Sequence, residues 1–162
     1  MTAMDVQIAV EGRLPRALGI SRKALSGAAR YFAARSAARS RLVFRAVSIS
    51  LQDDAMSDAA HRAVMGVEGA TDVITQRFEP IPPEPPGVYG ELCVNCDMAL
   101  RAGGAIAKSL KAWSPAKELL LYVAHGMDHL SGADDASPGE RAAMRRRELG
   151  WLGKLETEGM HQ

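Results

Sequence analysis

The proline-rich segment Pro80–Gly87 places the strongest constraint on how this chain folds. Five of its eight residues are proline, which fixes the backbone φ angle and has no N–H to donate. The segment cannot belong to a helix or a sheet, so we expect a loop there. Thr71–Thr75 before it and Tyr89–Val94 after it are rich in strand-forming residues. The loop therefore predicts that these two strands pair antiparallel.

The rest of the chain alternates between strand and helix patterns. Alternating apolar residues predict strands at Asp5–Val10 and Leu42–Leu51. Cap residues and apolar stripes predict helices at Ser21–Ser36, about 53–66, Asp97–Trp113, Ser114–Ser131 and Ser137–Trp151. A chain of 162 residues suits one domain, so we expect an α/β (α+β) fold with a small, mostly four-stranded sheet packed with about five helices. We place the domain at 1–155 and expect 156–162 to be a disordered tail.

Charge is distributed unevenly along the chain, although the net charge is only +1. Residues 1–50 contain nine Lys or Arg against two acidic residues, and the remainder is net acidic. This asymmetry favours a surface that faces a polyanion beside an acidic, metal-binding half. No stretch approaches the roughly 20 apolar residues of a membrane span, and no basic then apolar leader opens the chain. We therefore expect a cytoplasmic protein that does not enter a membrane.

The two cysteines, Cys93 and Cys96, form a Cys-x-x-Cys pattern that redox and zinc proteins share. A structural zinc site would need two further ligands, and a thioredoxin-like pair opens a helix with an exposed first cysteine. Cys93 falls inside the predicted strand Tyr89–Val94. We therefore expect it to be buried, with no redox or metal role.

The run His125–Asp135 concentrates residues that bind metals. On a helix, His125 and His129 lie four residues apart and project from the same face, where one cation could contact both imidazoles. Gly132 then allows a turn that could return Asp134 or Asp135 as a third ligand. The position after His125 is glycine, so the general-base Glu of the His-Glu-x-x-His peptidases is missing.

Three motifs together resemble the YbeY family of metal-dependent endoribonucleases that mature ribosomal RNA. Thr71–Thr75 resembles the family's Thr-Asp-Val-Leu-Ser strand, Tyr89–Val94 resembles its Leu-Gly-Asp-Ile-Val-Ile strand, and His125–Asp135 resembles its His-Gly-x-x-His-Leu-x-Gly-x-Asp-His signature. Supporting positions are His61, where an Asn is usual, and Met144 with Glu148. The resemblance covers about residues 42–152, while 1–41 match only in predicted structure.

The resemblance implies one zinc ion held by His125, His129 and Asp135, with Asp134 structural or outside the ligand set unless the two adjacent Asp exchange roles. Asp135 replaces the family's third His. Two His and one carboxylate still form a workable zinc site, but the exchange lowers the charge of the centre by one and should raise the pKa of a bound water.

A second departure concerns the arginine of the family. The position six residues before Thr71 holds Met65, where the family has a functionally important Arg. A phosphodiester transition state accumulates negative charge that a guanidinium stabilises. Arg62, one helical turn earlier, could take this role, and Arg77 is the other candidate. The catalytic residues expected from the resemblance are thus Arg62, His125 and His129.

The leading hypothesis is a zinc-dependent endoribonuclease that acts in ribosomal RNA maturation and ribosome quality control. A metal-bound water would attack single-stranded or ribosomal RNA, and the small ribosomal subunit would be the partner. The alternative is an RNA-binding or ribosome-binding maturation factor whose metal site has degenerated, and a third possibility is a metallohydrolase of another substrate. Among the other polar residues, Asp128 is expected to face solvent. Trp113 and Trp151 are expected to pack against the core.

Overall fold

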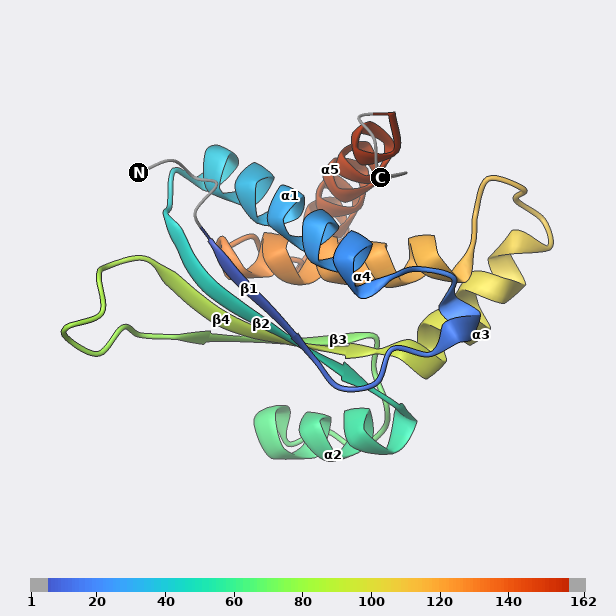
Figure 1. Ribbon diagram of the computed structural model, residues 1–162, viewed down its shortest axis with the longest axis horizontal. Helices are drawn as coiled ribbons and strands as arrows, with labels where there is room; N and C mark the ends of the chain where they lie inside the picture. The colour runs from blue at the N-terminus through green and yellow to red at the C-terminus, as the bar shows by residue number, and fades with distance from the viewer. Residues whose placement is uncertain (1–5, 158–162) are drawn as a thin grey trace.

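The computed structural model describes residues 6–157 and contains one four-stranded sheet with five α-helices and one short 3-10 helix (Figure 1). The elements are β1 (Gln7–Glu11), η1 (Arg16–Leu18), α1 (Arg22–Ser40), β2 (Phe44–Gln52), α2 (Asp54–Met65), β3 (Val73–Phe78), β4 (Val88–Asn95), α3 (Cys96–Ala107), α4 (Pro115–Leu130) and α5 (Pro138–Thr157). The predicted α/β (α+β) fold, with its four strands and five helices, is confirmed.

The sheet has the strand order β1-β2-β4-β3. β1 and β4 pair parallel with β2, and β3 pairs antiparallel with β4, from Val73 opposite Val94 to Phe78 opposite Tyr89. The antiparallel pairing predicted from the proline-rich loop is therefore correct. Because β3 pairs with β4 alone, it forms an edge of the sheet, and the loop that joins these two strands projects beyond the end of the sheet (Figure 1).

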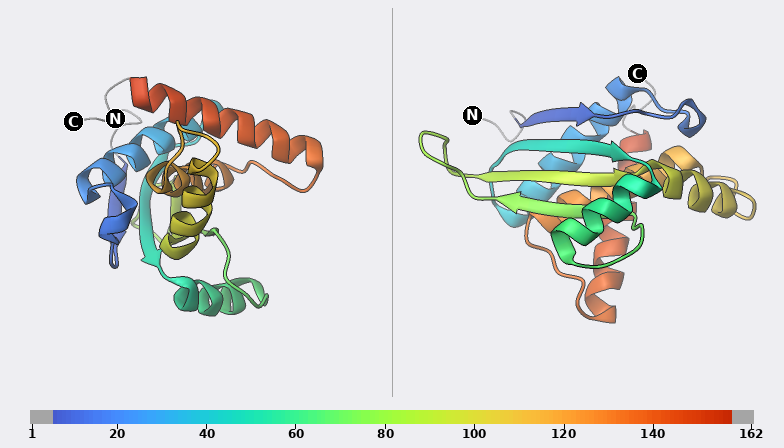
Figure 2. Two further views of the ribbon diagram at one scale, coloured as in Figure 1. Left: turned by 90° about the vertical axis from the view of Figure 1, so that its right-hand side faces the viewer. Right: turned by 90° about the horizontal axis from the view of Figure 1, so that it is seen from below.

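Helices α1 and α4 lie side by side on one face of the sheet (Figure 1). Their buried apolar side chains form the core with Val47, Ile49 and Leu92 of the sheet. Helix α5 packs against α4 and α1, while α2 crosses the opposite side of the sheet near the ends of β2 and β4 (Figure 2). The metal-candidate helix α4 is therefore supported by the sheet, α1, α3 and α5.

Several helix boundaries differ from the sequence predictions. Helix α1 continues to Ser40, where Arg41 ends it in the left-handed conformation, and α5 continues to Thr157, two residues into the predicted tail. Helix α3 ends at Ala107 instead of Trp113, because the chain must turn back over residues 108–113 to bring Pro115 against Gly103. Residues 1–5 and 158–162, which include Asp5 of the first predicted strand and most of the tail, lie outside the described residues.

Both cysteines are free and buried, as the sequence predicts for Cys93. Trp151 is buried and Trp113 packs at the edge of the core, which confirms their packing role. Among residues 6–157, no helix has the length and apolarity needed to cross a membrane.

Candidate metal centre

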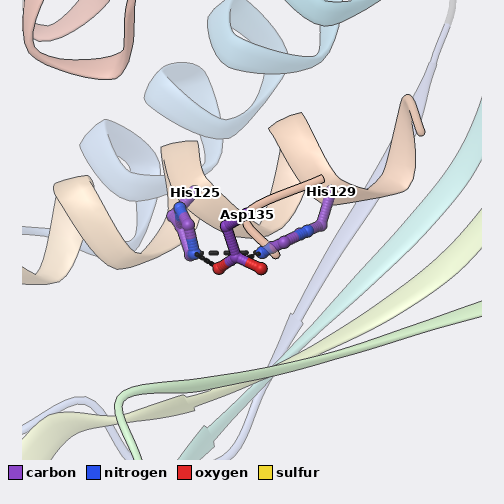
Figure 3. Close-up of side chains that lie close together, drawn as sticks. All are labelled: His125, His129 and Asp135. Atoms are coloured by element: carbon purple, nitrogen blue, oxygen red, sulfur yellow. Dashed lines mark hydrogen bonds and ion pairs between the residues drawn. The ribbon is translucent and has the colours of Figure 1, made fainter. Parts of the chain in front are cut away.

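Helix α4 presents His125 and His129 on one face. Ser114 caps its start by accepting the N–H of Lys117, and Pro115 occupies the first turn, where a missing N–H costs nothing. The run Leu119–Ala124 is buried and fixes the helix against the sheet. The two histidines remain half-buried beyond this run, with their Nε2 atoms 3.0 Å apart (Figure 3).

The loop after α4 brings Asp135 back to the two imidazoles. Gly132 has a φ of +97°, which allows the chain to reverse immediately after the helix. Asp135 Oδ2 then lies 3.4 Å from His129 Nε2 and 3.7 Å from His125 Nε2 (Figure 3). Asp134 instead accepts the N–H of Ala136 at 3.2 Å and so shapes the loop. The carboxylate that joins the two histidines is thus that of Asp135.

Hydrogen bonds on the far side of each ring orient both histidines. His125 Nδ1 lies 2.9 Å from Glu148 Oε2, and His129 Nδ1 lies 3.1 Å from the carbonyl oxygen of Ala133. Since both partners are acceptors, each neutral ring must carry its proton on Nδ1, which leaves a lone pair on each Nε2. The two lone pairs and the Asp135 carboxylate then converge within 4.8 Å, with only acceptors facing one another. This donor set fits a cation, and two His with one carboxylate is a known zinc combination.

Glu148 is buried and forms a hydrogen-bonded pair with the half-buried His125. Burial opposes protonation of His125, but the hydrogen bond and charge of Glu148 outweigh it, so the pKa of His125 is raised. Burial also raises the pKa of Glu148, although its hydrogen bond to His125 acts in the opposite direction. Glu148 lies 23 residues beyond His125, and the sequence marked it only as a supporting family position. Its role at the metal centre becomes visible only when α5 is placed against α4.

Asp128 corrects a sequence prediction, because it is fully buried instead of facing solvent. Arg147 of α5 donates three hydrogen bonds to it, at 2.8, 3.0 and 3.2 Å, and Arg39 of α1 lies 3.6 Å away. The pattern of α4 alone could not show this, since both arginines come from other helices. The carboxylate therefore fastens three helices together, and it also interacts with Glu148, the hydrogen-bond partner of His125.

A cleft of about 510 Å³ opens beside the metal centre between α2, β3 and α4. His125, His129 and Asp135 form one wall, and Arg77 lies in the lining of the cleft, where it donates to the carbonyl of Leu130. The remaining lining residues come chiefly from α2 and β3: His61, Met65, Thr71, Asp72, Val73, Ile74 and Thr75.

The structure does not bring Arg62 into this cleft. Its guanidinium is exposed and pairs with Asp58 at 3.1 Å and with Glu68 at 3.8 Å. The residue of α2 that shares the cleft with Met65 is His61, four positions earlier, and not Arg62. The sequence-based expectation that Arg62 could reach the position of the family Arg is therefore not met by this arrangement, whereas Arg77 does line the cleft.

A second, narrower cleft of about 180 Å³ lies on the other side of His125, between α4 and α5. It shares His125, Asp135 and Asp72 with the wide cleft. Its other lining residues are Leu121, Tyr122, Arg141, Arg145 and Glu148. The metal centre thus stands where two clefts meet.

Comparison with known sequences finds one matching family model, described as endoribonuclease YbeY, over residues 18–156. The endoribonuclease YbeY of Rhodopirellula baltica is 41% identical over 103 residues, which cover 64% of this chain and 50% of the relative. That of Pelotomaculum thermopropionicum is 33% identical over 113 residues, which cover 67% of this chain and 71% of the relative. The match thus spans about half the length of the first relative and more of the second.

A solved structure shares the fold. The solution structure of a Thermotoga maritima protein aligns with 97% of this chain and 95% of its own, with a TM-score of 0.54 and 19% sequence identity. At that identity the comparison supports the arrangement of the helices and strands and carries no information about chemistry.

Proposed function

The chain belongs to the endoribonuclease YbeY family, and we propose that it is a metal-dependent endoribonuclease that cleaves single-stranded RNA during ribosomal RNA maturation. The observation that carries the proposal is the convergence of His125 Nε2, His129 Nε2 and Asp135 Oδ2 at the junction of two clefts. The substrate would be a ribosomal RNA precursor and the partner the small ribosomal subunit, in the cytoplasm. A role in ribosome quality control would follow from the same activity.

The residues of the centre would hold one zinc ion, with His125, His129 and Asp135 as ligands. Such an ion supplies Lewis acidity, which polarises a phosphate oxygen and makes a water molecule more acidic. Glu148 and the Ala133 carbonyl keep the two Nε2 lone pairs directed at the ion by holding the Nδ1 protons. Because Asp135 stands where the family has its third His, the centre carries one positive charge fewer than the family pattern implies.

The wide cleft would receive the RNA strand. Its volume of about 510 Å³ lies within the range of roughly 300–1,000 Å³ that is usual for ligand sites. Arg77 is the cation of its lining, so we assign to Arg77, and not to Arg62, the contact with the phosphate at the centre. Arg62 is exposed and already paired with two carboxylates.

A second candidate function is RNA binding in ribosome maturation with little or no cleavage. Met65 favours it, since this side chain is 61% exposed in the wide cleft at the position where the family has an Arg. An apolar side chain cannot stabilise the charge that develops on a phosphate. Cleavage by the protein and its dependence on metal distinguish the two functions.

The metal ligands are tested by metal analysis of the purified protein beside Asp135→Ala and Asp134→Ala. We expect Asp135→Ala to lose most of the metal, because its carboxylate is the third donor, and Asp134→Ala to retain it. Equal metal contents in the two variants would show that Asp135 is not a ligand.

The activity is tested by incubating a ribosomal RNA precursor with the protein, with and without a chelator, and with His125→Ala. We expect cleavage that the chelator abolishes and zinc restores, and none by the variant. Cleavage that persists in chelator would refute metal dependence. RNA binding without cleavage by the metal-loaded protein would favour the second function.

A further inference from the structure

The narrow cleft between α4 and α5 is lined on its α5 side by two arginines, Arg141 and Arg145, that have no role in the proposed reaction. Arg141 and Arg145 lie four residues apart on α5, and Glu148 follows three residues after Arg145. Residues at these spacings share one face of a helix. Since Glu148 contacts His125 at 2.9 Å, this face of α5 is turned toward the metal centre.

The two arginines differ in how they are held. Arg141 donates to the backbone carbonyl of Asp135 at 3.1 Å, so it supports the loop that carries this ligand. Arg145 is exposed, lines the cleft and has no hydrogen bond or ion pair with any of residues 6–157. Its guanidinium therefore keeps all its donors for another group.

Three carboxylates line the same cleft and are the candidate ion-pair partners of Arg145. Glu148 is bonded to His125, and Asp135 faces both imidazoles. Asp72 accepts the N–H of Val73 at 2.7 Å and the hydroxyl of Thr71 at 3.3 Å. None of them forms an ion pair with Arg145, so neutralising these acids does not account for its position.

We propose that Arg145 binds a backbone phosphate of the RNA in the narrow cleft, so that the strand passes over the metal centre from one cleft to the other. This proposal rests on the proposed function. At about 180 Å³ the cleft falls below the usual size of a ligand site, which suits one phosphate with its sugar better than a complete nucleotide pocket. A guanidinium recognises phosphate oxygens with paired, charge-assisted hydrogen bonds.

Such a contact fixes the position of the strand. With Arg77 at the phosphate of the centre and Arg145 in the narrow cleft, the scissile phosphate and a neighbouring phosphate would both be held. A strand held at two points is presented to the centre in one register.

The test measures RNA binding by the full-length, metal-loaded protein. A short fluorescent single-stranded RNA is titrated with the protein, Arg145→Ala and the control Arg146→Ala, and a gel checks that the RNA stays intact. Arg146 is exposed and lies about 100° farther around the same helix, outside both clefts. The two variants remove the same charge from neighbouring positions, so their difference isolates the contact. Arg141 is avoided because it supports the Asp135 loop.

We expect Arg145→Ala to weaken binding about fivefold at 0.1 M salt relative to the control and to lower the slope of log K against log salt by about 0.7, the value for one phosphate contact on a single strand. In a series of RNAs, each phosphate in turn is replaced by a neutral methylphosphonate. At the linkage that Arg145 contacts, the replacement should weaken binding by the wild-type protein and leave binding by Arg145→Ala unchanged. Metal content should stay unchanged.

Equal effects of Arg145→Ala and Arg146→Ala, with no linkage at which the methylphosphonate effect depends on Arg145, would overturn the proposal while leaving the proposed function intact. Failure of the wild-type protein to bind the RNA at all would refute both. Reduced cleavage by Arg145→Ala with unchanged binding would also overturn the phosphate contact.

Discussion

The adjacent glycines of α3, Gly103 and Gly104, give a direct test of how closely α3 and α4 pack. A Cβ added at Gly103 would lie 2.5 Å from Pro115 Cα and 2.9 Å from Pro115 N, both of them backbone atoms at the start of α4. A Cβ added at Gly104 would meet nothing within 4 Å. Alanine at the two positions therefore has the same local effect on helix propensity, but only Gly103→Ala disturbs the packing of α3 against α4.

The magnitude follows from two terms. Replacing glycine by alanine inside a helix stabilises it by roughly 0.8–1 kcal/mol. At Gly103 the backbone of α4 must move away, because Pro115 Cα cannot rotate aside as the end of a side chain could, and overpacking of this kind costs about 1–3 kcal/mol. The propensity term cancels between the variants, so Gly103→Ala should unfold about 1–3 kcal/mol more easily than Gly104→Ala.

Thermal unfolding followed by circular dichroism measures this difference. For a domain of this size 1 kcal/mol corresponds to roughly 2–4 °C, so the two Tm values should differ by about 2–12 °C, with Gly104→Ala at or above the parent protein. His125 lies ten residues along α4 from Pro115, about 15 Å, so metal content should stay the same in both variants. If Gly103→Ala were as stabilising as Gly104→Ala, the close approach of the two helices would be refuted.

Two further predictions concern buried ionisable groups. Arg147→Ala should lower the free energy of unfolding by about 3 kcal/mol in urea titrations, which is the lower end for a broken buried pair because Arg39 stays close to Asp128. Arg146→Ala should change it by less than about 0.5 kcal/mol. Burial raises the pKa of Cys93 and Cys96 to about 11, so both thiols should be unreactive toward a disulfide reagent at pH 8 and react at once in denaturant. Because the unfolded thiols ionise near pH 9, stability should fall as pH rises from about 9 toward 11, and rapid labelling of the native protein at pH 8 would contradict their burial.

Local patterns were sufficient for most of the fold. The proline-rich loop set the antiparallel pairing of β3 and β4, and Ser114 with Pro115 marked the start of α4, because these signals act through neighbouring backbone groups. The end of α3 was missed for the opposite reason. The chain turns at Ala107 so that Pro115 can reach Gly103, and that contact depends on how two helices pack.

The same division holds at the site. The spacing of His125 and His129 predicted their common face, since an α-helix fixes it. Side chains that reach the site from other helices could not be predicted from the sequence. Asp128, for example, is contacted by Arg147 of α5 and Arg39 of α1. Helical spacing alone also failed for Arg62. This residue lies about one helical turn from Met65, yet it does not line the wide cleft.

Replacing Asp135 by histidine, the residue that the family has at this position, tests directly how the charge of the ligand set controls activity. Asp135 lies on the loop 131–137 with 39% of its side chain exposed, so an imidazole at this position has space to turn toward the other two rings. In Asp135→His the ligands would be neutral, and the centre would gain one positive charge. A more positive centre makes water more acidic, and each unit by which the pKa of the attacking water falls increases its ionised fraction at neutral pH about tenfold.

We therefore expect Asp135→His to retain the metal and to cleave a ribosomal RNA precursor faster at pH 7, with the gain shrinking as pH rises. Metal analysis and initial cleavage rates between pH 6 and 9 measure both effects, and Asp134→His serves as the control because Asp134 shapes the loop without facing the imidazoles. Unchanged rates with full metal occupancy would mean that the charge of the third ligand does not limit the reaction. The missing arginine at Met65 would then be the stronger constraint, since it removes a charge that stabilises the phosphate directly and not through the ligands.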